Sequence, residues 1–268
     1  MSVPSGQRTG PLVDTPDSRP VFFFDIDNCL YSRSNKIHDI MQKLIDEFFT
    51  KHLSLSVEDA KMLHQKYYTE YGLAIEGLTR HHKIDPLVFN REVDDALPLG
   101  NILTPDAELR TLLEDFDTSK AKPWLFTNAY VNHGKRVVKL LGIDHLFEGI
   151  TFCDYSAPKL ICKPQPEMFD KAEKEANAPS TSECYFVGAS SLGRNYYHNP
   201  HSPLTSIPDD SALNCRHAKA RGWNTAHLVE PGIASPETPP TDHEIKSLHE
   251  LRGIFPQFFK STNGGNLP

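Results

Sequence analysis

Residues 21–31 read Val-Phe-Phe-Phe-Asp-Ile-Asp-Asn-Cys-Leu-Tyr, and this stretch decides the fold. Four apolar residues in a row, Val21 to Phe24, are typical of a buried parallel strand that is covered on both faces. We therefore predict a strand over 21–25 in an open α/β sheet. Such sheets bind ligands beyond the carboxyl ends of their strands, which is where Asp25 and Asp27 occur.

Two carboxylates with one residue between them can act as a pair on a phosphoryl group. One can attack phosphorus, while the other serves as acid and base beside a divalent cation. A strand followed by an acidic turn is the plainer interpretation, and Asp-x-Asp alone does not exclude it. The rest of the chain has to decide between the two.

Composition indicates a globular protein with one large core, or a core with a smaller inserted domain. The net charge of −7 argues against nucleic-acid binding as the main role. No apolar run approaches the ~18–20 residues of a membrane span. The five cysteines are scattered without paired metal spacing, which predicts reduced thiols in an intracellular protein of the cytoplasm or nucleus. We expect a small-molecule partner, and neither a nucleic acid nor a membrane.

An all-helical insert is predicted over residues 37–98. Apolar residues recur at spacings of three and four from Ile37 to Phe49. Further helices are predicted over 56–71, 72–82 and 86–96, with a cap signal from Ser56 and Asp59 at the start of the first. An insert after the first strand can close over the site and exclude water.

Strands and helices alternate after this insert, which predicts parallel pairing and right-handed crossovers. The predicted strands are 122–126, 149–153, 184–187 and 225–228, and the predicted helices are 106–116, 130–141, 167–176, 214–221 and 245–259. The fold class is thus α/β, a Rossmann-like parallel sheet with helices on both faces and a helical cap. We assign the core to 20–36 and 99–260, a disordered tail to 1–19 and a loose tail to 261–268.

Three later motifs share the position of the first, each just past a predicted strand or on a neighbouring loop. Thr127-Asn128 supplies a hydroxyl and an amide, Lys163 a cation, and Asp209-Asp210 two carboxylates suited to Mg²⁺. Each has a plainer alternative: a turn or cap, a solvated bend, and an N-cap pair. Their order along the chain, together with the first motif, favours a phosphoryl-transfer site.

With these motifs the chain resembles the haloacid-dehalogenase superfamily, whose four motifs match Asp25-x-Asp27, Thr127, Lys163 and Asp209-Asp210. It is more closely similar to the fungal-type pyrimidine 5′-nucleotidases of that superfamily. The matching stretches are 24–31, 67–78, 124–130, 152–155 and 162–164, and the resemblance covers about residues 20–230.

The resemblance implies a role for each residue. Asp25 would be the nucleophile that forms an aspartyl-phosphate, and Asp27 would protonate the leaving oxygen and then activate water. Thr127, Asn128 and Lys163 would bind the phosphoryl oxygens. Mg²⁺ would be held by Asp25, the carbonyl of Asp27, and the pair Asp209 and Asp210.

The cap carries aromatic groups that can stack on a base: Tyr67, Tyr68, Tyr71 and the pair His81-His82. Tyrosines four apart on a helix more often pack a core. The resemblance favours a block at 68–78 that faces the active site, without showing which tyrosine contacts substrate.

The fourth motif is interrupted. In the family that the chain resembles, a Tyr-Phe-Val strand runs directly into Asp-Asp-Ser, whereas here 21 residues, 188–208, separate Val187 from Asp209. This segment lacks apolar periodicity and predicts an irregular loop, unusually long for a compact domain. It is either a real surface loop or a retained intron. Its 63 coding nucleotides are in frame, can begin with GT and end with AG, and their removal restores Phe-Val-Asp-Asp-Ser.

The sequence is therefore consistent with three alternative functions. The first is a Mg²⁺-dependent phosphatase for nucleoside 5′-monophosphates, with a preference for pyrimidines such as UMP and CMP. The second is a phosphatase for another small phosphomonoester, such as lysophosphatidate, nicotinamide mononucleotide or a sugar phosphate. The third is a non-catalytic product whose fourth motif is displaced.

Overall fold

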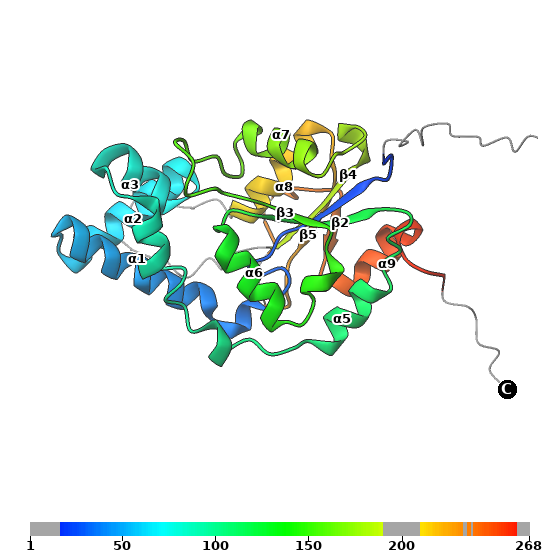
Figure 1. Ribbon diagram of the computed structural model, residues 1–268, viewed down its shortest axis with the longest axis horizontal. Helices are drawn as coiled ribbons and strands as arrows, with labels where there is room; N and C mark the ends of the chain where they lie inside the picture. Colours follow the sequence, from blue (N-terminus) through cyan, green and yellow to red (C-terminus); the bar gives the residue numbers. More distant parts are fainter. Residues whose placement is uncertain (1–16, 190–209, 233–234, 237, 262–268) are drawn as a thin grey trace, which may run out of the picture.

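The computed structural model describes residues 17–189, 210–232, 235–236 and 238–261, and it confirms the predicted α/β class (Figure 1). Six strands of the described chain form one sheet, ordered β3-β2-β1-β4-β5-β6, and every neighbouring pair is parallel. The strands are β1 (Val21–Phe24), β2 (Lys122–Thr127), β3 (Gly149–Phe152), β4 (Cys184–Ala189), β5 (Asn224–Leu228) and β6 (His243–Ile245).

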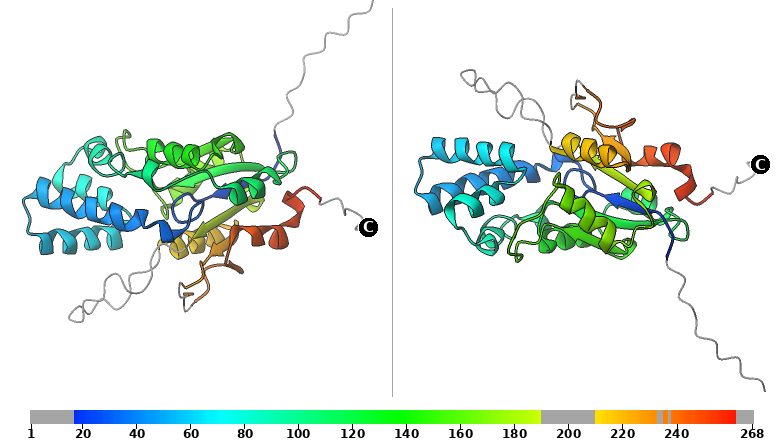
Figure 2. Two further views of the ribbon diagram at one scale, coloured as in Figure 1. Left: turned by 90° about the horizontal axis from the view of Figure 1, so that it is seen from below. Right: turned by 90° about the horizontal axis from the view of Figure 1, so that it is seen from above.

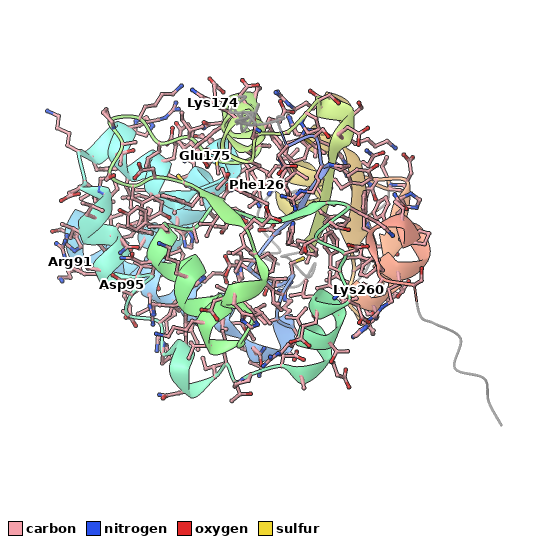
Figure 3. The ribbon with its side chains drawn as sticks, turned by 45° about the vertical axis from the view of Figure 1, so that its right-hand side comes forward. Arg91, Asp95, Phe126, Lys174, Glu175 and Lys260 are labelled. Atoms are coloured by element: carbon pink, nitrogen blue, oxygen red, sulfur yellow. The ribbon has the colours of Figure 1, made fainter. Side chains whose placement is uncertain are left out.

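Strand β1 lies inside the sheet, between β2 and β4, and its side chains alternate between two hydrophobic cores. Phe22 and Phe24 belong to one core, while Val21 and Phe23 belong to the other. This arrangement explains the unbroken apolar run, because both faces of a parallel sheet are covered by helices. Phe126 of β2 is likewise inside the molecule (Figure 3).

Helices of the core cover both faces of the sheet. Apolar residues of α5, α6 and α9 join the core around Phe22 and Phe24, and those of α7 and α8 join the core around Phe23. These helices are α5 (Ala107–Glu114), α6 (Val131–Leu140), α7 (Pro166–Glu175), α8 (Asp210–Arg221) and α9 (Leu251–Ile254). Short 3-10 turns occur at Arg33–Asn35, Leu99–Asn101, Asp144–Leu146, Thr181–Glu183, Leu248–Glu250 and Pro256–Phe258.

The cap consists of helices packed around a core of their own. They are α1 (Ile37–Leu53), α2 (Val57–Tyr71), α3 (Ala74–His82) and α4 (Pro86–Glu92). The cap projects from one end of the sheet domain, opposite the end where the chain finishes (Figure 2). Ser56 caps α2 as predicted, accepting a hydrogen bond from Asp59 N–H. Gly72, predicted to begin the next helix, instead ends α2 in the left-handed conformation, with a backbone φ of 79°.

The predicted terminal helix over 245–259 is wrong. Ile245 instead lies in β6, which pairs with β5 at the edge of the sheet, and the chain then forms α9 and short turns. The apolar residues Leu248, Leu251, Phe255 and Phe258 repeat at helical spacing and are buried. Their period reflects burial against the sheet, and Pro256 prevents a continuous helix.

Two segments predicted to be irregular or disordered also differ from the prediction. Gly188 and Ala189 are not irregular, because they continue β4 and pair with His227 and Leu228 of β5. Arg19, assigned to a disordered tail, forms ion pairs with Asp17 and Glu148. The remainder of the expected loop, 190–208, and most of both expected tails lie outside the described residues. No described helix has the length and apolar character that a membrane crossing requires.

Candidate active site

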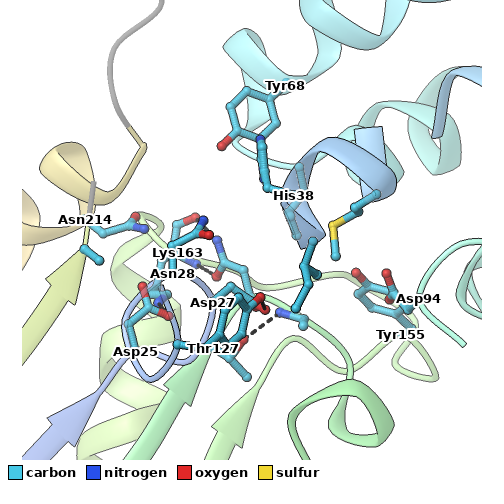
Figure 4. A pocket seen from close by; sticks show the side chains of 17 residues that line it. Asp25, Asp27, Asn28, His38, Tyr68, Asp94, Thr127, Tyr155, Lys163 and Asn214 are labelled. Carbon is cyan, nitrogen blue, oxygen red and sulfur yellow. Dashed lines mark hydrogen bonds and ion pairs between the residues drawn. The ribbon is translucent and has the colours of Figure 1, made fainter. Parts of the chain in front are cut away.

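The carboxyl ends of β1 and β2 meet at one edge of the sheet, where the first three predicted motifs converge. One cavity of about 130 Å³ has Asp25, Asp27, Thr127, Asn128 and Lys163 in its wall (Figure 4). The chain brings these residues together because parallel strands place their carboxyl ends side by side.

Asp25 and Lys163 form a buried ion pair at the base of the cavity. Lys163 Nζ lies 2.9 Å from Asp25 Oδ1, and Ile26 N–H donates to the same oxygen at 2.9 Å. Burial raises the pKa of Asp25, and the nearby Lys163 ammonium opposes that rise. Both protein donors contact Oδ1, so Oδ2 is the oxygen that remains for an incoming group.

Lys163 is held from two sides. Its ammonium donates to the Phe126 carbonyl at 2.9 Å and lies 4.9 Å from the centre of the Phe126 ring. Asn128 bonds to its main chain twice, with Lys163 N–H donating to Oδ1 at 2.7 Å and Nδ2 donating to the Lys163 carbonyl at 2.9 Å. Asn128, expected to bind phosphoryl oxygens, therefore uses its amide to position the lysine. Thr127 Oγ1 accepts from Ala129 N–H, which leaves the hydroxyl proton to be donated to a ligand.

Asp27 is held by two side chains that the motifs did not include. The Tyr31 hydroxyl and His133 Nε2 each donate to Asp27 Oδ1, both at 2.7 Å. His133 is completely buried on α6, six residues after Thr127. The sequence signal that could have found it is a histidine in the helix that follows the second motif.

These contacts set the charges of the pair. Burial would raise the pKa of Asp27, but the charge and hydrogen bond of His133, together with Tyr31, lower it. Burial disfavours the His133 imidazolium, but the Asp27 carboxylate outweighs this effect and raises the pKa of His133. Since Oδ1 of Asp27 accepts both hydrogen bonds, Oδ2 is the oxygen that remains for a ligand.

Comparison with known proteins agrees with this geometry. A model of the haloacid dehalogenase-like hydrolases matches residues 20–191. The chain belongs to this family. The match ends where the segment between β4 and α8 begins, so it includes the first three motifs of this hydrolase and not Asp209-Asp210.

One relative and two solved structures are similar to the hydrolase. Phosphate metabolism protein 8 of Saccharomyces cerevisiae is 38% identical over 230 residues, which cover 82% of this chain and 65% of that protein. A haloacid dehalogenase-type phosphatase from Thermococcus onnurineus shares the fold at 16% identity, with TM-score 0.55 and coverage of 88% of this chain and 97% of its own. CbbY from Rhodobacter sphaeroides, solved with phosphate, gives TM-score 0.55 at 15% identity, covering 87% and 96%.

The metal ligands predicted from the fourth motif, Asp209 and Asp210, cannot be placed at the site from the described residues. Asp209 lies outside them, and Asp210 begins α8 with its side chain outside them as well. Ala189 occupies the end of β4 in the cavity wall instead. Across the described ranges, no three His, Cys, Asp or Glu side chains are grouped to hold a metal ion.

Some oxygen donors of the hydrolase nevertheless suit Mg²⁺. Asn214 reaches the cavity from α8 (Figure 4), and its Oδ1 is buried without a hydrogen-bond partner among the described residues. Asp25 and this amide oxygen are hard ligands of the kind that Mg²⁺ prefers. They are an incomplete set, which the Asp209-Asp210 pair would have to extend.

The cap tyrosines of the hydrolase separate into different environments. Tyr68 lines the active-site cavity (Figure 4). Tyr67 is 4% exposed, packs in the cap core and contacts His82 Nε2 through its hydroxyl at 2.6 Å. Tyr71 contacts His81 Nε2 at 2.8 Å. The packing interpretation thus describes Tyr67, and Tyr68 is the tyrosine placed to meet a ligand.

Tyr31 and His133 fix the position of the Asp27 carboxyl group, so loss of either donor is expected to misplace it and slow reactions in which it must protonate the leaving oxygen. We expect His133→Gln and Tyr31→Phe to lower kcat/KM for UMP by about tenfold to a hundredfold, within the usual contribution of general acid catalysis. For p-nitrophenyl phosphate the loss should stay under about threefold, because nitrophenolate departs without a proton. The parameter kcat/KM reports the steps up to and including departure of the leaving group. Equal losses on both substrates would contradict this role.

Proposed function

We propose that the protein hydrolyses nucleoside 5′-monophosphates, pyrimidine nucleotides in particular, through an aspartyl-phosphate on Asp25. The observation that carries the proposal is the pairing of two differently held carboxylates. Asp25 is bonded to Lys163, and Asp27 is bonded to Tyr31 and His133. Two carboxylates in different environments can divide nucleophile and acid–base roles.

The chemistry follows from these contacts. Asp25 Oδ2 attacks phosphorus, the bond from phosphorus to the nucleoside oxygen breaks, and Asp27 Oδ2 gives that oxygen a proton. Asp27 then takes a proton from water, which attacks the aspartyl-phosphate and releases inorganic phosphate. The low pKa of Asp27 suits the second step, while a bound phosphoryl dianion raises it for the first. Lys163 and Thr127 stabilise charge on the phosphoryl oxygens.

Mg²⁺ would be held by Asp25, the Asp27 carbonyl and the Asp209-Asp210 pair, with Asn214 nearby, and it would neutralise phosphoryl charge. The described residues support part of this set, as Asp25 and Asn214 both line the cavity.

The cap supports a nucleoside as the leaving group. Tyr68, His38 and Tyr155 line the cavity from above and beside the catalytic aspartates, so an aromatic base has rings to contact (Figure 4). The name of the yeast relative indicates phosphate metabolism and supports phosphomonoesters as a class. Lysophosphatidate, nicotinamide mononucleotide and sugar phosphates are the alternative substrates within that class.

A panel of phosphomonoesters tests the proposal. Phosphate release is measured from UMP, CMP, AMP, nicotinamide mononucleotide, ribose 5-phosphate and lysophosphatidate, each with and without Mg²⁺. We expect UMP and CMP to give the highest kcat/KM, and chelation of Mg²⁺ to abolish turnover. Higher activity on any other member would reassign the substrate, and no release from any member would favour a non-catalytic product.

Removal of the aromatic ring of Tyr68 tests whether this residue contacts the base. Tyr68→Ala should raise KM for UMP about fivefold to a hundredfold, since stacking on a base contributes ~1–3 kcal/mol, and should change KM for glycerol phosphate little. Tyr68→Phe keeps the ring and is the matched control, with KM for UMP expected near that of the wild type. A similar rise in KM for both substrates would show that Tyr68 only supports the cap.

A further inference from the structure

Asp94 is a buried carboxyl that the reaction steps above do not use. It lies two residues beyond the end of α4, where the cap returns to the core, and it is 3% exposed. Its side chain forms part of the wall of the active-site cavity and also of a second chamber of about 80 Å³. Asp94 therefore stands at the boundary between the catalytic groups and the interior of the cap (Figure 4).

The two cavities adjoin one another. They share His38, Met41, Tyr68, Leu73, Asp94 and Tyr155 in their walls. The rest of the chamber is mainly apolar and comes from the cap, including Ile45, Ile75 and Phe89. A leaving group that extends from Asp25 towards this chamber would pass Asp94.

Several other polar groups of the chamber wall contact protein. His38 Nε2 and Gln42 Nε2 lie 3.0 Å apart, and His64 Nδ1 lies 2.8 Å from Asp46 Oδ1. No described residue donates a hydrogen bond to the Asp94 carboxyl group, and its Oδ2 is buried without a partner. Arg136, the nearby cation, donates to the main-chain carbonyl of Asp94 instead.

An unpartnered buried carboxyl lowers stability unless a ligand satisfies it. Such a group loses its hydrogen bonds to water on folding and gains none in return. Burial raises the pKa of Asp94 to about 7, with His133 opposing the rise. Near neutral pH a large share of the group is therefore the neutral acid, which both donates and accepts hydrogen bonds.

We propose that Asp94 binds the polar part of the leaving group, a ribose hydroxyl or the amide edge of a pyrimidine, and selects nucleosides over acyl chains. This proposal rests on the proposed function, because it assigns specificity within the same site. An acyl chain would cover the Asp94 carboxyl with methylene groups and leave it without a partner. A nucleoside offers the donor and acceptor pair that the neutral carboxyl complements.

Ligand binding tests the proposal independently of turnover. Calorimetry on the full chain without Mg²⁺ measures Kd for UMP, ribose 5-phosphate and inorganic phosphate. Asp94→Leu, close in shape and apolar, should weaken UMP binding at least tenfold and leave phosphate binding unchanged. Asp94→Asn keeps a donor and an acceptor and should stay within threefold of the wild type. Asp94→Leu should also raise Tm, because it removes the unpartnered carboxyl.

The matched control is Asp95→Asn, at the adjacent, exposed carboxylate of the same turn (Figure 3). Its Kd for UMP should equal that of the wild type. If Asp94→Leu weakens the binding of both UMP and ribose 5-phosphate, Asp94 contacts the sugar. If it weakens only the binding of UMP, Asp94 contacts the base.

Unchanged UMP affinity in Asp94→Leu, an equal loss for inorganic phosphate, or wild-type UMP affinity no higher than that for phosphate would each overturn the proposal. Failure of the proposed function looks different. The wild type would then bind UMP through Asp94 and release no phosphate from it when Mg²⁺ is supplied.

Discussion

Asp25→Asn is expected to abolish phosphate release from UMP while the protein stays folded. The substitution keeps the shape of the side chain and removes the negative oxygen that attacks phosphorus. An asparagine oxygen can still accept from Ile26 N–H and Lys163, the two donors to Asp25 Oδ1. We therefore expect at least a hundredfold loss of kcat, or ~2.7 kcal/mol in the barrier, with a circular-dichroism melting curve that remains cooperative.

The control for this substitution is Asp144→Asn. Asp144 is a carboxylate with a side chain 56% exposed, outside the lining of the active-site cavity. Its kcat should match that of the wild type. If Asp25→Asn keeps more than about a tenth of kcat, a barrier change under ~1.4 kcal/mol, Asp25 is not the nucleophile.

Deletion of residues 188–208 is expected to increase the response of the enzyme to Mg²⁺. In the full chain, Gly188 and Ala189 continue β4 past Val187, whose carbonyl accepts from Asp25 N–H at 3.0 Å. After the deletion, Asp209 and Asp210 would follow Val187 directly and take these two strand positions. A strand backbone beside Asp25 then aims the carboxylates, and catalytic groups tolerate only ~0.5 Å of misplacement.

Helix α8 already packs beside β4 in the full chain. Ala189 of β4 and Asn214 of α8 both line the active-site cavity. The shortened connection therefore joins segments that lie close together. Phosphate release from UMP, titrated with Mg²⁺, should show at least a tenfold higher kcat/KM in the deletion variant, and Mg²⁺ should raise its Tm further.

The matched control is the same deletion with Asp209 and Asp210 both changed to asparagine. This variant should not show the increase in kcat/KM with Mg²⁺. Sequencing of the mature transcript tests the origin of the segment. A dominant message that retains all 63 nucleotides and encodes a fully active protein would favour a genuine surface loop over a retained intron. Equal Mg²⁺ responses of the full chain and the deletion variant would contradict the structural argument.

Local sequence patterns determined the sheet and the position of the site. The run from Val21 to Phe24 predicts a strand covered on both faces, and the structure divides its side chains between two cores. Asp25 and Thr127 could be grouped from sequence because the ends of parallel strands meet at one edge, whereas Lys163 comes from the loop between β3 and α7. In these cases the deciding information is short-range, a strand pattern followed by a polar residue.

Tertiary structure decided the contacts that give each group its role. No local pattern shows what His133 and Asn128 contact, since their partners lie tens of residues away along the chain. Nor does any local pattern place Asp94 in the cavity wall. Tyr67 and Tyr68 are adjacent in sequence, yet Tyr67 packs in the cap and Tyr68 lines the cavity. Helical neighbours point about 100° apart, so which one meets the ligand depends on how the cap packs on the core. Likewise, the apolar period after Ile245 records burial, while pairing with β5 makes that segment begin as a strand.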